Sequence, residues 1–309
     1  METKKVHQNA IHRSTDVIIL HTAAYLFCGV IAIACLLPFI MVISASFSSE
    51  MAVQMRGFSL LPQDPTLDAY RQVFAEPFII IRAYIVTITL TVVGTAAGLF
   101  VQSMTAYVLA RRDFSWRNGF SLFFYFTTLF SGGLVPYYVL MTQYLRLKNN
   151  YLALFLPIIF SVYNLLILKS YVMSIPNDMI EAAKIDGCGA FRTFVTIILP
   201  LIKPALATVG LFIALAYWND WYSAMLFVSN DDMKPLQYML YEKINNIEAY
   251  KRLIASGRST SSDVVSALSL PTQTLKMALT VVVTGPIILL YPVVQKYYVQ
   301  GLTIGAVKG

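Results

Sequence analysis

Residues 174–200 read SIPNDMIEAAKIDGCGAFRTFVTIILP and contain several signals for local structure. Pro176 suits the first turn of a helix, because its missing N–H would have no partner there anyway. Asp178 and Glu181 favour the positive N-terminal end of that helix. Gly187 is typical of the residue that ends one. We therefore expect a short helix followed by a tight turn.

The rest of this stretch predicts a second helix, which begins near Ala190 and stops before Pro200. In the first helix, Met179, Ala182 and Ala183 can share one face. The expected product is a rigid helix-turn-helix with small side chains on one side and charges on the other.

The composition of the whole chain places this unit in a membrane protein. Of the 309 residues, 57% are hydrophobic and 13% are charged, whereas a soluble domain carries about 25% charged residues. The mean hydropathy is +0.65. The net charge of +7 comes without a basic stripe interleaved with aromatic residues, so we expect no nucleic-acid partner.

A helix needs about 20 apolar residues to cross the bilayer core, and six segments meet this length. They lie at about 17–44, 83–110, 119–144, 151–171, 205–227 and 277–294. The first continues past Cys35 to Ile43, which is too long for the apolar region of a signal peptide. Ser131-Gly132-Gly133 interrupts the third, as a packing kink or as a break beside a water-filled path.

Cationic residues in short loops predict the orientation. Arg111, Arg112 and Arg117 lie between the second and third segments, and such loops stay in the cytoplasm. We expect a cytoplasmic tail at 1–16, a transmembrane domain at 17–294 and a cytoplasmic tail at 295–309. The link 174–200 is then cytoplasmic, and the loop 228–276 is external. Apolar residues at helical spacing from Leu236 to Ile254 predict a helix in that loop.

Three motifs together resemble a known family. Glu181-Ala182-Ala183-Lys184-Ile185-Asp186-Gly187 is similar to the EAA loop of binding-protein-dependent ABC-importer permeases, in the form found in carbohydrate importers of the MalG-like group. Tyr217-Trp218-Asn219-Asp220-Trp221 resembles the same group, as do the C-terminal stretches 291–301 and 305–309. Cys188 stands where this group more often has Ala.

The resemblance implies an all-α integral membrane protein with six transmembrane helices and the type I importer (MetI-like) fold. It implies a permease subunit of the bacterial inner membrane, forming half of a pathway for a sugar or oligosaccharide. The implied partners are a second homologous permease, an ATPase dimer, an external solute-binding protein and membrane lipid. No G-x-x-x-x-G-K-[ST] motif occurs, so no cofactor is expected in this chain, and the ATPase would bind ATP and Mg.

The resemblance also implies which residues couple to the ATPase. The EAA helix of this family docks in a groove of the ATPase subunit, and the Glu181 carboxylate can pair with a cation there. An ordinary amphipathic connector is the alternative. The expected coupling residues are Glu181, Ala182, Ala183, Asp186 and Gly187. We expect no catalytic residue and no metal ligand.

Polar and aromatic residues within the spans are candidates for a sugar pathway: Trp218, Asn219, Asp220, Trp221, Tyr222 and Asn164. Aromatic rings stack on sugar faces, and the amide and the acid bind hydroxyls. Alternatively, Trp and Tyr belong to an interfacial belt and Asp220 caps a neighbouring helix. Asn164 and Gln102 could equally form inter-helix hydrogen bonds.

In the external loop, Tyr238 and Tyr241 are candidates for contact with the binding protein, and a lid packed on neighbouring spans is the alternative. An ion-coupled secondary transporter remains the second functional hypothesis. It would require paired carboxylates within the spans and repeat symmetry, and only Asp220 is available. A membrane enzyme would require clustered His, Asp or Glu, and His21 stands alone in its span.

Overall fold

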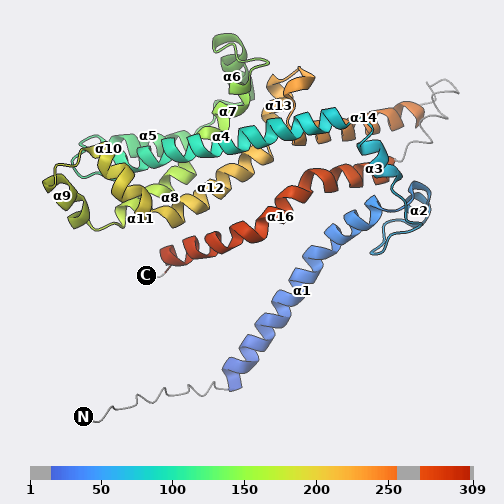
Figure 1. Cartoon of the computed structure of the whole chain (residues 1–309), viewed down its shortest axis with the longest axis horizontal. Coiled ribbons are helices and arrows are strands. Elements are labelled where there is room, and N and C mark those ends of the chain that lie inside the picture. Colours follow the sequence, from blue (N-terminus) through green and yellow to red (C-terminus); the bar gives the residue numbers. More distant parts are fainter. Residues whose placement is uncertain (1–14, 256–271, 307–309) are drawn as a thin grey trace. The chain divides into compact units, whose positions relative to one another are not determined.

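The described part of the chain consists of helices joined by short connections (Figure 1). The computed structural model describes residues 15–255 and 272–306, and no strand occurs within these ranges. The predicted all-α fold is therefore confirmed. The expected N-terminal tail, 1–16, falls almost wholly outside the described residues. The chain divides into two compact units, residues 1–71 with 271–281 and residues 72–270 with 282–309.

Three of the described helices are long and apolar enough to cross a membrane, and the number rises to six if each of three bent helix pairs forms one span. The long helices are α1 (Thr15–Ser46), α4 (Pro77–Ala110) and α16 (Thr272–Ala306). The first bent pair joins α5 (Arg117–Leu129) to α6 (Leu134–Val139), which continues as the π-helical turn η1 (Leu140–Tyr144). The second pair joins α7 (Tyr151–Ile159) to α8 (Val162–Met173). The third joins the helical segment Ala190–Leu201 to α12 (Lys203–Trp218).

The third predicted span, 119–144, bends by 113°. The break follows α5 and ends at Gly133, whose φ of +85° is the left-handed conformation that glycine adopts without strain. The predicted interruption of this span is confirmed. The fourth span bends by 45°.

The fifth predicted span, 205–227, is also not one helix. α12 ends at Trp218, and three residues separate it from α13 (Tyr222–Phe227). Asn219 donates through its side-chain nitrogen to the Leu215 carbonyl (2.9 Å), and Asp220 accepts from the Ser223 amide (3.1 Å). Such side chain to backbone bonds compete with helical ones, and they explain why the helix is interrupted here. The sixth helix, by contrast, begins earlier than predicted and continues to Ala306 through the expected tail.

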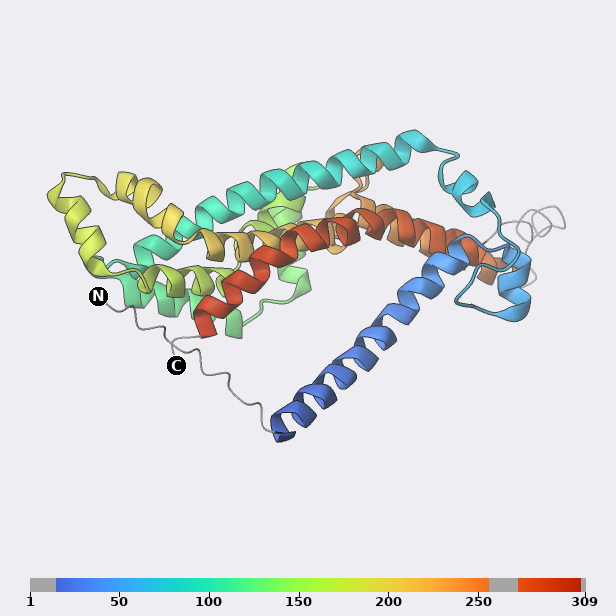
Figure 2. The ribbon, with the colours of Figure 1, turned by 60° about the horizontal axis from the view of Figure 1, so that its bottom comes forward.

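α4 is the central helix of the second unit, and α7, α8 and α12 pack against it (Figure 2). Two glycines of α4 allow this close packing. A side-chain carbon on Gly94 would overlap the ring of Tyr217, and one on Gly98 would lie 3.1 Å from the Ile159 carbonyl oxygen. Small residues at helix contacts let backbones approach closely in membranes.

The break between α7 and α8 is stabilised by side chains from the neighbouring helices. Gln102 of α4 donates to the Ile159 carbonyl (2.9 Å), and the Tyr217 hydroxyl of α12 donates to the Phe155 carbonyl (2.7 Å). Broken helices are tolerated inside a membrane where protein groups bind the freed backbone atoms. The predicted inter-helix hydrogen bond of Gln102 is thus confirmed.

The helix predicted in the loop 228–276 is α14 (Leu236–Ala255), preceded by a short 3-10 turn, η3 (Asp231–Met233). Its first turns pack on the N-terminal half of α4 (Figure 1). The Leu236 amide donates to the Thr87 hydroxyl (2.8 Å), and Asp232 forms an ion pair with Arg82. Leu236 and Met239 are buried, so part of the apolar pattern is used within the chain.

In the first unit, the carboxylate of Glu50 binds the N-terminus of α16. Glu50 begins α2 (Glu50–Arg56) and accepts from the amides of Gln273 and Thr274 (both 2.9 Å) and from the Thr274 hydroxyl (2.9 Å). A carboxylate there satisfies unpaired amides and complements the helix dipole. Burial raises the pKa of Glu50, but the hydrogen bonds from Thr274 and Gln273 outweigh it, and the pKa falls below its usual value. This contact fixes the start of α16.

The Glu50 contact predicts a local effect on α16. Glu50→Ala should speed amide hydrogen exchange at Gln273 and Thr274 by about tenfold or more, because a hydrogen bond to a charged group contributes ~1.5–3 kcal/mol. The pKa of Glu50 is lower in the folded chain than its usual 4.5, so the stabilisation is complete above pH 4.5 and lost as the pH falls through the folded pKa.

The measurement is peptide-resolved hydrogen exchange on the detergent-solubilised chain. Arg56→Ala, at an exposed position of the same helix, should leave exchange at Gln273 and Thr274 unchanged. Equal exchange in the Glu50→Ala and wild-type chains would show that the carboxylate does not hold α16.

Candidate functional site

The predicted helix and turn at 174–200 are present. Pro176 is the residue before α9 (Asn177–Ile185), and Gly187 follows its C-cap with a φ of +76°. The Cys188 amide donates to the Ala183 carbonyl (2.9 Å) and the Gly187 amide donates to the Lys184 carbonyl (3.0 Å). This pair of bonds is a Schellman motif, which needs a left-handed residue at the position of Gly187. The turn therefore has a fixed geometry set by local sequence.

The second helix begins where the sequence predicts but does not stop at Pro200. α10 (Ala190–Thr193) continues through a π-helical turn, η2 (Phe194–Ile198), into α11 (Leu199–Leu201). Pro200 lies within this continuous run, directly after the π-helical turn, and removes one backbone donor from it. The chain then bends by 85° into α12. The expected end before Pro200 is therefore wrong.

α9 presents different residues to its own chain and to the outside. Ala183 is 4% exposed and Ile180 is half-buried, so these two face inward. Met179, Ala182 and Ile185 are exposed, Ile185 to 86%. The expected shared face of Met179, Ala182 and Ala183 is wrong for Ala183, because that side chain packs α9 against the chain. Glu181, Asp186 and Gly187 remain exposed.

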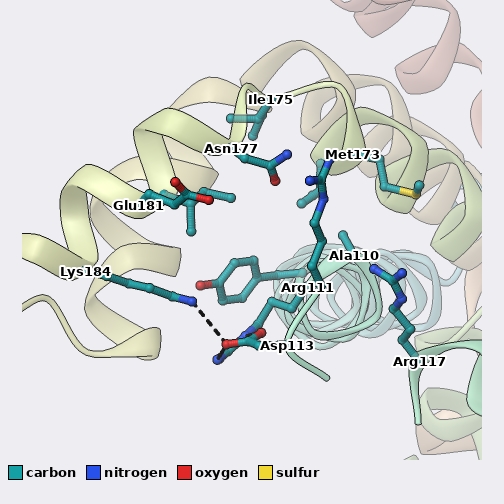
Figure 3. Close-up of a pocket in the computed structure, with 13 residues that line it drawn as sticks. Ala110, Arg111, Asp113, Arg117, Met173, Ile175, Asn177, Glu181 and Lys184 are labelled. Atoms are coloured by element: carbon teal, nitrogen blue, oxygen red, sulfur yellow. Dashed lines mark hydrogen bonds and ion pairs between the residues drawn. The ribbon is translucent and has the colours of Figure 1, made fainter. Parts of the chain in front are cut away.

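A cavity of about 190 Å³ separates α9 from the connection between α4 and α5 (Figure 3). One carboxylate, Asp113, joins its two walls. Arg111 donates to it through Nε (2.9 Å) and Nη2 (2.7 Å), and Lys184 of α9 donates through Nζ (3.2 Å). The bonds from Arg111, with a smaller contribution from Lys184, hold the pKa of Asp113 well below its usual range. Asp113 is thus ionised and ties α9 to the end of α4.

Glu181 lines the same cavity, and Figure 3 shows its carboxylate on the α9 wall. Within residues 15–255 and 272–306, no ion pair is formed by Glu181. Its charge is available to a cation from outside the chain.

The structure brings together two sets of residues that the sequence analysis treated as separate sites. Trp221, in the break before α13, stacks on Tyr241 of α14 with ring centres 4.4 Å apart, and Tyr222 lies edge-on to Trp221 at 5.8 Å. Tyr238 stacks on Tyr241 at 6.4 Å. Trp221, Tyr222 and Tyr241 are exposed. We call Trp221, Tyr222, Tyr238 and Tyr241 the aromatic cluster.

The other pathway candidates do not share one surface. Asn219 is exposed beside the cluster, and its side-chain oxygen accepts from Gln237 of α14 at 3.4 Å. Asp220 caps α13, the structural role that the sequence left open. Trp218 and Asn164 are 7% and 6% exposed. These two are buried among the helices, so the structure does not group them with the exposed candidates.

Two residues at the α9 end escaped the sequence analysis. Asp113 follows the Arg111-Arg112 pair directly, and an acid within a basic loop was the available signal. Lys169 lies in α8 and donates to the Ser121 hydroxyl of α5 (2.7 Å). A cation within an apolar run was the signal for Lys169, since such residues reach toward the membrane boundary.

Comparison with known proteins assigns the family. Residues 102–304 match the family described as "Binding-protein-dependent transport system inner membrane component", a transport component and not a catalytic enzyme. A polygalacturonan/rhamnogalacturonan transport system permease protein of Bacillus subtilis (strain 168) is 40% identical, over 92% of this chain and 96% of the relative's chain. The trehalose/maltose transport system permease protein MalG of Thermococcus litoralis is 30% identical, over 90% of this chain and 93% of the relative's chain.

A solved structure agrees with these relatives. A chain from a bacterial ABC transporter involved in import of the acidic polysaccharide alginate superposes with a TM-score of 0.79 at 28% identity, covering 92% of this chain and 98% of that one. An ion-coupled transporter is not favoured. The chain belongs to the binding-protein-dependent transport system inner membrane components, as a permease subunit of an ATP-binding-cassette importer.

Proposed function

We propose that α9 is the element through which this permease is driven by a separate ATPase subunit. The exposed surface of Met179, Ala182 and Ile185, next to the unpaired Glu181 carboxylate, carries this proposal. Apolar groups that a chain leaves uncovered at a polar link fit a protein partner. The Schellman turn and the inward packing of Ala183 keep this surface rigid. Asp186 and Gly187 contribute through the turn.

We further propose that the ATPase is a dimer that binds ATP and Mg, and that a second, related permease completes the pathway. An ATPase dimer presents two docking grooves, and this chain supplies one α9. Closure of the dimer would then move two permeases against each other.

The distribution of cations supports a cytoplasmic position for α9. Arg111, Arg112, Arg117, Lys184 and Arg192 all lie in or beside the connections at this end of α4. Cytoplasmic loops carry such an excess. With six spans, both termini are then cytoplasmic, and α14 lies outside.

For the substrate, we propose a sugar or oligosaccharide delivered by an external binding protein. The relatives named above are described as permeases for carbohydrates of different kinds. The aromatic cluster offers exposed rings at the α14 end, beside the Asn219 amide. Rings of this kind suit the apolar faces of sugars, and the amide suits their hydroxyls. We assign Tyr238 and Tyr241 to the region that the loaded binding protein contacts.

The docking role of Glu181 predicts a loss of coupling. Glu181→Lys should lower ATP hydrolysis stimulated by the loaded binding protein at least about tenfold, because like charges would meet in the groove. The measurement uses the reconstituted complex of both permeases, the ATPase and the binding protein. Asp64→Lys makes the same charge change at an exposed carboxylate in the connection after α2, which forms no ion pair within the described residues, and should leave stimulation intact. Full stimulation with Glu181→Lys would refute the docking assignment.

The aromatic cluster predicts an effect on stimulation from the outside. Tyr241→Ala and Trp221→Ala should each lower stimulation roughly two- to tenfold, because an aromatic pair contributes ~0.5–1.5 kcal/mol beyond its area. Basal hydrolysis should stay unchanged. Galacturonate oligomers and maltose, each with a binding protein that takes it, serve as probes.

Tyr144→Ala is the matched control, since Tyr144 is 78% exposed at the end of η1, next to the hairpin link. If both cluster variants are stimulated at the wild-type level with both probes, the aromatic cluster has no role in stimulation.

A further inference from the structure

The cavity beside α9 has more positive than negative side chains. Arg111, Arg112, Arg117 and Lys184 line it, against the two carboxylates of Asp113 and Glu181. Asp113 is fully engaged by Arg111 and Lys184. The two remaining guanidinium groups therefore set the charge of the cavity.

Neither Arg112 nor Arg117 forms an ion pair with a carboxylate of the described residues. Arg112 faces the neutral side-chain amide of Asn177, whose oxygen accepts from Nη2 at 2.7 Å when it is turned toward the guanidinium. Figure 3 shows Arg117 on the side of the cavity opposite Lys184. Guanidinium groups present several N–H donors in a plane, a geometry that suits phosphate oxygens.

Apolar groups complete the lining. Ala110, Val172, Met173 and Ile175 come from the ends of α4 and α8, where these helices leave the apolar part of the unit. Met173 is 64% exposed, and Trp116 and Phe120, beside Arg117, are 72% and 47% exposed. Tryptophan at such a place marks the boundary between bilayer and water. The cavity thus combines guanidinium donors with apolar surface, which suit the phosphate and the acyl chains of a phospholipid.

We propose that this cavity binds the phosphate group of an anionic phospholipid, with Arg112 and Arg117 as the principal ligands. The proposal rests on the proposed orientation, which places the cavity in the cytoplasmic leaflet. A volume of about 190 Å³ accommodates a phosphate with part of its glycerol, and the apolar lining receives the start of the acyl chains. Basic pockets between transmembrane helices on the cytoplasmic side bind such headgroups. Because α9 forms one wall, the bound lipid contacts the helix that docks to the ATPase.

The test measures phospholipid bound to the full-length chain, purified in neutral detergent without ATPase subunits, by native mass spectrometry. Short-chain phosphatidylglycerol should bind more tightly than phosphatidylcholine with the same acyl chains. Arg112→Gln combined with Arg117→Gln should weaken phosphatidylglycerol binding by roughly tenfold or more. Arg146→Gln combined with Lys148→Gln removes two exposed cations from the hairpin link and should change nothing.

A conservative variant separates binding from misfolding. Arg112→Lys with Arg117→Lys keeps the charge, so it should retain most of the preference for phosphatidylglycerol. Equal binding of both lipids by the wild-type chain, or unchanged binding in the Gln variant, overturns the proposal. If millimolar inorganic phosphate displaces phosphatidylglycerol, the cavity is a site for a soluble anion, and the lipid proposal is again overturned.

A third outcome concerns the ATPase. If phosphatidylglycerol is released when the ATPase subunits are added, the cavity binds an acidic side chain of the ATPase in the complex. That outcome would overturn the lipid proposal. Because lipid binding is measured without ATPase, its failure is distinct from a failure of Glu181 to couple, which the hydrolysis assay reports.

Discussion

The helices of the second unit pack around the close approach of α4 to α12 and α7 at Gly94 and Gly98. This approach places Gln102 where its amide binds the Ile159 carbonyl at the end of α7, and Tyr217 where its hydroxyl binds the Phe155 carbonyl one turn earlier. Without Gln102, the break between α7 and α8 would leave the Ile159 carbonyl without this partner in an apolar environment, at several kcal/mol. The two glycines, the break between α7 and α8 and the two hydrogen-bond donors therefore depend on one another.

α4 also connects the two candidate functional regions. At its C-terminal end, Asp113 binds Lys184 of α9, and along its N-terminal half, Thr87 binds the start of α14. The Asp113–Lys184 pair is about half exposed, and such pairs contribute only about 0–1 kcal/mol. Burial of Ala183 and Ile180 therefore contributes more to the attachment of α9, and the ion pair sets its position. If α9 docks on the ATPase as proposed, a displacement of α9 would move α4, and α4 would move α14.

The parts of this structure that could be predicted from the sequence are those that depend on residues close together in the chain. The turn after α9 was predictable because the left-handed Gly187 and its two hydrogen bonds lie within six residues. The six apolar segments were predictable from length. The 85° bend before α12 and the end of α12 at Trp218 were not, because apolar composition does not distinguish a straight helix from a broken one. The stacking of Trp221 on Tyr241 joins residues from two predicted sites, and only the fold brings them together.

The central claim is that α9, α4 and α14 move as one body during transport. A distance between two spin labels tests this directly. One label is on Cys188 in the turn after α9, and the other is on Asn245→Cys in α14, in a chain freed of Cys28 and Cys35. The distance is measured in the reconstituted complex without nucleotide and again with ATP trapped. We expect the distance within this chain to stay the same, while the distance from Cys188 to the second permease changes. A shift of the distance between residues 188 and 245 on trapping ATP would show that α9 moves independently of α4.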